Sequence, residues 1–318
     1  MKIIDHNTIA GLQIPYAQQL DWVENVFKLK SSCILPPKIS LPIIENGFFN
    51  TMPSVIPSED CFGAKIVTRY PSRIPSLQSQ LFLYQLSSGE FKAVMDATWI
   101  TAARTGAVAA LSVKYFAKTH FSKILFIGLG NTARSTFKCL KTIYSSKNLT
   151  IGVVRYKNQA ESFIQEFQKD VPSWKFIVMD DIPTSIKWAD VVISCVTVAN
   201  NIFAEDAYFT KGVTVIPVHT KGFQNCDLFF DKFFVDDISH VEHFKNYNIF
   251  KERMSEFSEV IKGNVKGREN DEERILCYNI GIGLHDIYFA NKICRLCEER
   301  KINMNVSELG PKLDKFWY

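Results

Sequence analysis

The sequence predicts an α/β protein built around a doubly wound parallel sheet, and two observations carry this prediction. The first is a short apolar run that leads through a glycine-containing turn into a helical pattern, over residues 123–134. The second is the alternation of strand-like and helix-like segments that follows. Such alternation predicts parallel strands joined by right-handed crossovers, with helices covering the sheet.

The first third of the chain has a different character. Residues 15–30 carry apolar side chains at helical spacing, and the alanine-rich residues 98–117 also predict a helix. Between them lie β-like runs at residues 48–52, 64–68 and 81–86. A Ser-Ser-Gly-Glu turn at residues 87–90 predicts that residues 81–86 and 91–95 form an antiparallel pair.

From residue 123 onward the segments alternate. We expect strands at residues 124–127, 150–154, 176–179, 191–194 and 213–218, and helices at residues 132–145, 159–169 and 182–188. A region rich in Phe and Asp follows. We then expect a helix over residues 251–260, a polar loop over 262–273 and a final helix from about residue 283 to 300.

Composition excludes several classes of protein. The 318 residues are 47% hydrophobic and 22% charged, with a net charge of +4, which is typical of a globular protein. The basic residues are scattered, so we expect no nucleic-acid partner. We find neither an apolar run long enough to span a bilayer nor a basic start followed by an apolar core, so we expect no membrane partner and a cytoplasmic location.

Eight cysteines are dispersed through mostly apolar contexts. Only Cys294 and Cys297 are close together, inside a helical pattern and without a second pair. We therefore expect reduced, mostly buried thiols and no metal site.

The glycine turn has the pattern Gly128-x-Gly130-x-x-Ala133. Gly128 permits a tight turn, Gly130 allows close approach of a phosphate, and small Ala133 allows the helix to pack on the strand. Asn131 and Thr132 complete the turn, where free N–H groups and the helix dipole favour an anion. The pattern predicts a dinucleotide site.

The end of the second strand of this region distinguishes the two nicotinamide cofactors. It carries Arg155 and Lys157 rather than a carboxylate, which favours the 2′-phosphate of NADP(H) over NAD(H), with Lys157 or Arg134 assisting. The alternative is that these cations simply lie in solvent. Thr197 and Val218 end later strands, on the edge that faces the ligand crevice, so both are candidate cofactor contacts.

Motifs outside this turn resemble those of the ornithine cyclodeaminase/mu-crystallin family, in the family's order. They are Met52-Pro53, Gly63-Ala64-Lys65, Leu77-Gln78-Ser79 after Pro71, Arg104-Thr105-Gly106-Ala107, Ala189-Asp190-Val191-Val192, Gly263 to Gly267-Arg268, and Asn279 to Asp286. The resemblance spans nearly the whole chain. It implies that the Rossmann-type sheet, residues 119–283, is inserted in a discontinuous α+β domain of residues 1–118 and 284–318. That domain would bind substrate and form a homodimer.

The resemblance also implies roles for individual residues. Lys65 would lie beside an amino acid, imino acid or imine substrate, and Arg104 would clamp its carboxylate and also contact the cofactor. Lys38 is the nearest match to a family arginine, while Ser79 keeps the hydroxyl of a family threonine near the cofactor. Asn279 stands where the family often has serine near the nicotinamide.

The chain departs from the family after residue 218. Family cyclodeaminases carry a catalytic aspartate there, and a gapless alignment places Lys221 at its position. A protonated lysine cannot accept a hydrogen bond from an amine. The alternative is a shifted loop in which Asp227 or another carboxylate takes the role.

These observations leave three hypotheses. The first is an NAD(P)-dependent oxidoreductase acting at a C–N bond, with Lys65, Lys221 or His219 supplying a proton. The second is the cyclodeaminase reaction, from ornithine to proline and ammonia with recycled NAD. The third is a non-catalytic protein, like the crystallin member, that binds NADPH or a small ligand.

Overall fold

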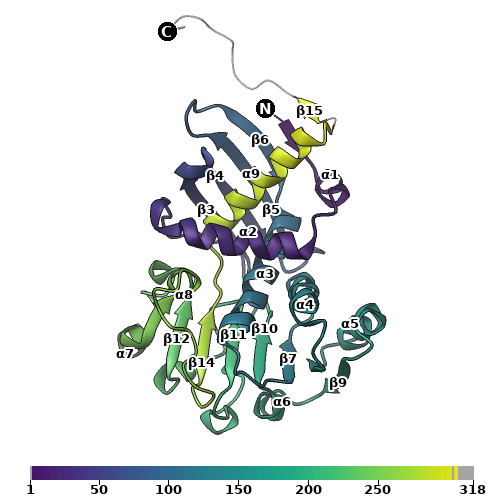
Figure 1. The fold of residues 1–318 in the computed structure, drawn as a ribbon, viewed down its shortest axis with the longest axis vertical. Helices are drawn as coiled ribbons and strands as arrows, with labels where there is room; N and C mark the ends of the chain where they lie inside the picture. Colours follow the sequence, from purple (N-terminus) through teal and green to yellow (C-terminus); the bar gives the residue numbers. More distant parts are fainter. Residues whose placement is uncertain (1, 303, 307–318) are drawn as a thin grey trace, which may run out of the picture.

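Two sheets organise the chain, as Figure 1 shows for the computed structural model, which describes residues 2–302 and 304–306. The upper sheet has the strand order β15-β1-β6-β5-β4-β3-β2, and the lower sheet has the order β13-β12-β14-β11-β10-β7-β8-β9. The chain passes from the upper sheet to the lower one and returns in α9 (Gly283–Glu299).

The upper sheet is mixed. Its strands are β1 (Lys2–Ile4), β2 (Ile39–Pro42), β3 (Phe48–Ile56), β4 (Cys61–Arg69), β5 (Leu77–Gln85), β6 (Phe91–Asp96) and β15 (Asn305–Val306). The predicted hairpin of β5 and β6 is confirmed, and β2 to β6 pair antiparallel in sequence. The sequence did not predict β1 or β2. Helix α9 packs against β3, β4 and β5. Helix α2 (Tyr16–Leu29) packs against α9, and α1 (His6–Gly11) precedes α2 in the chain.

The lower sheet is parallel throughout. Its strands are β7 (Lys123–Ile127), β8 (Thr150–Val154), β9 (Lys175–Met179), β10 (Val191–Ser194), β11 (Thr214–Pro217), β12 (Lys232–Val235), β13 (Met254–Glu256) and β14 (Ile275–Tyr278). Three helices follow its first strands: α4 (Asn131–Tyr144), α5 (Gln159–Phe167) and α6 (Ile182–Trp188). The run β9-β8-β7-β10-β11 is the strand order of a Rossmann-type sheet. The predicted fold class is confirmed.

The prediction was wrong in the segment between β11 and α9. Residues 251–260 do not form one helix, because Met254–Glu256 pairs as β13 with β12 and interrupts it. Short helices flank this strand: α7 (Tyr247–Phe250) and α8 (Phe257–Ile261). Two strands were also missed there, β12 and β14, each four residues long.

Single-turn 3₁₀ helices lie at several connections: Lys30–Ser32, Pro57–Glu59, Gln168–Asp170, Asp206–Tyr208, Cys226–Leu228, Ile238–His240 and Lys251–Arg253.

Helix α3 (Thr98–Phe116) joins the two sheets. It packs against α2, α9 and β5 of the upper part and against α4 of the lower part. A Cβ at Gly106 would lie 2.4 Å from the Ser135 hydroxyl, so this glycine allows α3 and α4 to pack closely. The close packing of α3 on α4 fixes the glycine turn, which precedes α4, relative to the side chains of α3.

All eight cysteines are free thiols, and six of them are buried. Within the described residues we find no helix with the length and apolar character needed to span a membrane. The same residues contain no cluster of three or more His, Cys, Asp or Glu side chains arranged to hold a metal ion.

Candidate active site

A cavity of about 490 Å³ lies between the two sheets, at the carboxyl ends of β10 and β11. It is lined by several predicted site residues: Lys38, Lys65, Arg104, Thr132, Thr197, Val218, His219 and Asn279. Side chains from the upper sheet and α3 thus meet the strand ends of the Rossmann-type sheet. This edge is where doubly wound sheets bind their ligands.

A buried ion cluster forms the upper wall of the cavity. Lys65 Nζ lies 2.8 Å from Oδ2 of Asp286, and Arg104 Nε donates to Oδ1 of the same carboxylate at 2.9 Å. All three side chains are buried. When Lys65 is protonated, two cations share one anion, so the cluster carries a net positive charge and favours an anionic ligand.

Burial and the neighbouring Arg104 lower the pKa of Lys65 to about 7, and the Asp286 carboxylate only partly offsets them. An ordinary lysine stays protonated far above neutral pH. Lys65 is therefore poised to hold or release a proton near pH 7.

Gly281 allows Arg104 to occupy its position. A Cβ at Gly281, whose φ is +86°, would lie 2.4 Å from Nη1 of Arg104. The N–H of Gly281 donates to Asp236 Oδ2 at 2.5 Å. Within the described residues neither Nη nitrogen of Arg104 has a hydrogen-bond partner, so both are available to a ligand.

Lys38 is a further cation of the cavity, close enough to Arg104 and Lys65 to interact with their charges. Its backbone N–H donates to Nε2 of His240 at 3.3 Å, and its Nζ donates to the carbonyl of Ile280 at 3.4 Å. Burial lowers the pKa of Lys38, although the Asp236 carboxylate acts in the opposite direction. Burial also raises the pKa of Asp236 to about 6.

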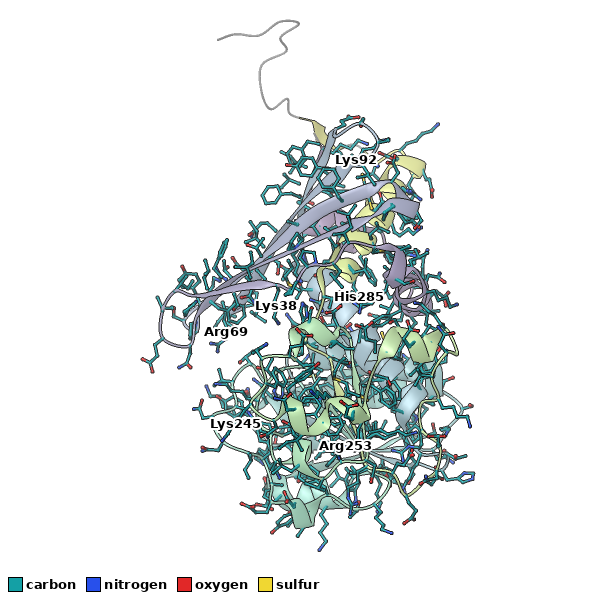
Figure 2. All side chains as sticks on the ribbon, turned by 90° about the vertical axis from the view of Figure 1, so that its left-hand side faces the viewer. Lys38, Arg69, Lys92, Lys245, Arg253 and His285 are labelled. Carbon is teal, nitrogen blue, oxygen red and sulfur yellow. The ribbon has the colours of Figure 1, made fainter. Side chains whose placement is uncertain are left out.

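His285 is a packing residue beside this cluster. It is fully buried, and its ring contacts Phe27 edge-on at a centroid distance of 4.5 Å. Burial and the nearby Arg104 keep its pKa well below the usual value, so the ring is neutral. Figure 2 labels it at the level of the boundary between the two sheets, as it does Lys38.

The glycine turn fits the phosphates of a dinucleotide. Gly128 has a φ of +83°, and a Cβ there would lie 3.0 Å from the backbone of Val196, whereas a Cβ at Gly130 would meet nothing within 4 Å. Helix α4 begins at Asn131 with no side-chain cap and no acidic residue in its first turn. Its N–H groups are thus free to bind an anion beside the open space at Gly130. Ala133, in the first turn of α4, is buried.

Arg155 lies away from the cavity, at the exposed end of β8. Its Nε donates to Asp180 Oδ1 at 2.7 Å, and it also pairs with Glu161. These two carboxylates raise its pKa. Any 2′-phosphate would have to compete with both of them.

Ser79 contacts a residue that lines the cavity, whereas Asn279 lines the cavity itself. The hydroxyl of buried Ser79 lies 3.1 Å from that of Thr101, which lines the cavity, whereas Ser79 does not. Asn279 lines the cavity, and its Nδ2 donates to Ser112 Oγ on α3 at 3.0 Å.

Of the three candidate residues in the loop after β11, only one lines the cavity. His219 lines the cavity, and its Nε2 lies 2.6 Å from the Ser194 hydroxyl. Burial lowers its pKa to about 4, so the ring is neutral at pH 7. Lys221 is exposed and does not line the cavity. Asp227 does not line it either: its carboxylate accepts from Tyr278 at 2.8 Å within the lower core.

Sequence reasoning missed several residues of the site. Asp286 was part of a quoted motif but received no role, and Asp236 followed a strand that was not predicted. Asn50, Arg69 and His240 line the cavity without having been candidates. The one available signal was alternation in β4, which places Arg69 on the same face as Lys65.

The sequence is similar to those of known proteins over most of its length. The nodulation efficiency protein NfeD of Rhizobium meliloti is 24% identical over 96% of this chain and 98% of its own length. A Delta(1)-pyrroline-2-carboxylate reductase of Bacillus cereus is 23% identical over 86% of this chain and 89% of its own.

Two solved structures share the fold. One is the Delta(1)-pyrroline-2-carboxylate reductase of Thermococcus litoralis in complex with NADH and L-proline, with a TM-score of 0.86 at 21% identity, covering 96% of this chain and all of that one. The other is an archaeal alanine dehydrogenase dimer with bound NAD, with a TM-score of 0.84 at 22% identity, covering 97% and 99% of the two chains.

The family profile matches residues 3–300, nearly the whole chain. The expected class, an enzyme that reduces imines or oxidises amines, is confirmed by the reductases and dehydrogenases among the relatives. The chain belongs to the ornithine cyclodeaminase/mu-crystallin family.

Proposed function

We propose that this protein is a nicotinamide-dependent reductase of an α-imino acid, which in reverse oxidises the corresponding amino acid. The observation that carries the proposal is the buried cluster in which Lys65 and Arg104 share Asp286 at the wall of the cavity. One carboxylate does not neutralise two cations, so the α-carboxylate of the substrate completes the charge balance.

Arg104 binds that carboxylate. Its Nε is occupied by Asp286, which fixes the plane of the guanidinium, while both Nη nitrogens remain free beside Gly281. A fixed, planar pair of donors orients a carboxylate and with it the adjacent C=N carbon.

Lys65 supplies the proton. Reduction of C=N adds hydride to carbon and a proton to nitrogen, and a bound nicotinamide supplies the hydride. A side chain whose pKa lies near 7 donates a proton readily at neutral pH, and Lys65 is the buried cation of the cavity with that property. His219, neutral at pH 7, and exposed Lys221 are less suited to the role.

The cofactor we propose is NADP(H) in preference to NAD(H), bound at Gly128, Gly130 and the start of α4. Arg155 and Lys157 at the end of β8 support this choice, because no acidic residue occupies that strand end. Since Arg155 is already paired with Asp180 and Glu161, we expect the preference for NADP(H) to be modest.

We do not propose the cyclodeaminase reaction. Among the described residues that line the cavity there is no Asp or Glu to act on an amine or a water, and Asp227 lies elsewhere.

We also propose the two-domain division of the sequence prediction, residues 1–118 with 284–318 and residues 119–283, and a homodimer formed through the upper sheet. The packing of α9 on β3 and β4 supports the discontinuous domain. The stacked rings of Phe62, Tyr84 and Phe91, which are only partly buried, support an interface on the sheet's other face. Analytical ultracentrifugation of the full chain tests the dimer, and a monomer at all concentrations would contradict it.

The test of function is a reductase assay. Loss of reduced-nicotinamide absorbance is followed with cyclic and open-chain α-imino acids, the latter formed from 2-oxo acids and an amine. We expect turnover with wild type and a large loss in Arg104→Lys, which keeps the charge without the planar fork. Release of ammonia from ornithine with no net change in absorbance would instead support the cyclodeaminase.

A further inference from the structure

Arg69 is a buried cation of the cavity for which the proposed reaction has no use. It is the last residue of β4, lines the cavity and is only 8% exposed. Its Nη2 donates to the Thr197 hydroxyl at 3.4 Å, and its Nη1 donates to the carbonyl of Asn46. Its buried Nε has no partner, and none of the described carboxylates forms an ion pair with it.

Register places this cation far from the ion cluster but on the same wall. Lys65 and Arg69 lie on the same buried face of β4, four residues apart, with Val67 between them. A strand rises about 3.3 Å per residue, so their backbones are separated by about 13 Å. The cavity therefore has two cationic ends: one formed by Lys65 and Arg104, and the other formed by Arg69. In Figure 2 Arg69 is labelled beside the boundary between the two sheets, farther out than Lys38.

The two ends differ in how their charge is balanced. Asp286 serves Lys65 and Arg104, and Asp236 lies near Lys38, whereas Arg69 has only neutral oxygens around it. A buried guanidinium without an anion is unfavourable. Asn50, on the neighbouring strand, adds a buried amide whose oxygen also lacks a partner, and an amide can present either a donor or an acceptor to a ligand.

We propose that Arg69 binds a second carboxylate, carried on the side chain of the substrate, so that the enzyme acts on a dianionic imino or amino acid. The proposal rests on the proposed function, because it places the first carboxylate at Arg104. The free Nε, next to a weakly held Nη2, is the edge of a guanidinium that receives a carboxylate side-on.

The experiment compares matched substrates in wild type and Arg69→Gln. Imines are formed from 2-oxoglutarate and from 2-oxohexanoate, a neutral-chain 2-oxo acid of similar size, with the same amine. We expect wild type to prefer the dicarboxylate, and Arg69→Gln to lose about a hundredfold in kcat/KM with it and less than about threefold with the neutral-chain acid. Arg73→Gln is the matched control. Arg73 bonds to Thr68 and Ser76 in the same loop without lining the cavity, so it reports on loop disturbance alone.

Three kinetic results and one binding result would overturn the proposal. An equal loss with both substrates, a wild-type preference for the neutral chain, or a matching loss in Arg73→Gln would overturn the proposal. So would weaker binding of NADPH to Arg69→Gln in a fluorescence titration, since Arg69 would then serve the cofactor through the Thr197 region.

If neither substrate turns over, the proposed reaction fails while the second site remains testable. Calorimetry with glutarate and pentanoate on the full chain then decides: tighter binding of glutarate that is lost in Arg69→Gln supports the second carboxylate site, and equal binding of the two acids contradicts it.

Discussion

The buried cluster at Asp286 and the exposed cluster at Arg155 differ in the ratio of cations to carboxylates. At the first, two cations share one carboxylate in a fully buried setting, whereas at the second one cation is held by two carboxylates at the protein surface. Solvent screens the surface cluster, so its pairs contribute little to stability. Burial removes this screening from the first cluster, so its charges interact strongly. Its excess positive charge favours the binding of an anion in the cavity.

The largest expected effect is that of Asp286→Asn. Removing the shared carboxylate leaves Lys65 and Arg104 buried without an anion, which we expect to lower the free energy of unfolding by about 3–5 kcal/mol. Denaturant unfolding measures it. The matched control is Asp180→Asn at the exposed cluster, which we expect to leave the unfolding midpoint nearly unchanged; equal effects of the two variants would remove the contrast between the clusters.

Arg104→Lys tests whether the buried cluster recognises the substrate carboxylate. We expect kcat/KM for an α-imino acid to fall by about a hundredfold, because a single ammonium cannot replace the planar fork. Steady-state kinetics measure the loss. Binding of NADPH should be little changed, and an equal loss in cofactor affinity would assign Arg104 to the cofactor instead.

The pH profile tests Lys65. Its pKa of about 7 means that the protonated, donating form is depleted as the pH rises through 7. We therefore expect kcat/KM for imine reduction to fall about tenfold per pH unit above that value, and the reverse reaction, which needs neutral Lys65, to rise over the same range. Lys65→Arg stays protonated, so we expect it to abolish the fall in kcat/KM above pH 7. If the fall persists in this variant, the titrating group is not Lys65.

The smallest effect is expected at the exposed cluster. Arg155→Ala should weaken NADPH by about threefold to tenfold relative to NADH, because a solvated cation already paired with two carboxylates contributes modestly. Fluorescence titration with both cofactors measures the ratio. An unchanged ratio would mean that this strand end does not contact the 2′-phosphate.

The lower sheet could be predicted well because its signals are local. Continuous apolar strands, a glycine turn and intervening helices identify the Rossmann order from β7 onward. The segment that contains β12, β13 and β14 could not be predicted, because those short strands exist through pairing with one another and with β11.

The site could be predicted only where a motif pointed to it. Lys65 and Arg104 came from the family resemblance, but their shared carboxylate is 182 residues from Arg104 along the chain and resembles an ordinary acidic residue in the first turn of a helix. Arg69 resembles a surface cation at a strand end until the fold shows it to be buried. In each case burial gives the residue its chemistry, and burial depends on contacts between distant segments.

Transfer of deuterium from the cofactor shows whether hydride reaches the carbon of the imine. Wild-type protein is incubated with an α-imino acid and NADPH that carries deuterium at both positions of its reactive carbon, and the product is analysed by mass spectrometry. We expect deuterium on the carbon that bears the nitrogen, one atom for each cofactor oxidised. A product without deuterium, or ammonia released from a diamino acid with no net oxidation of the cofactor, would contradict the proposed reduction.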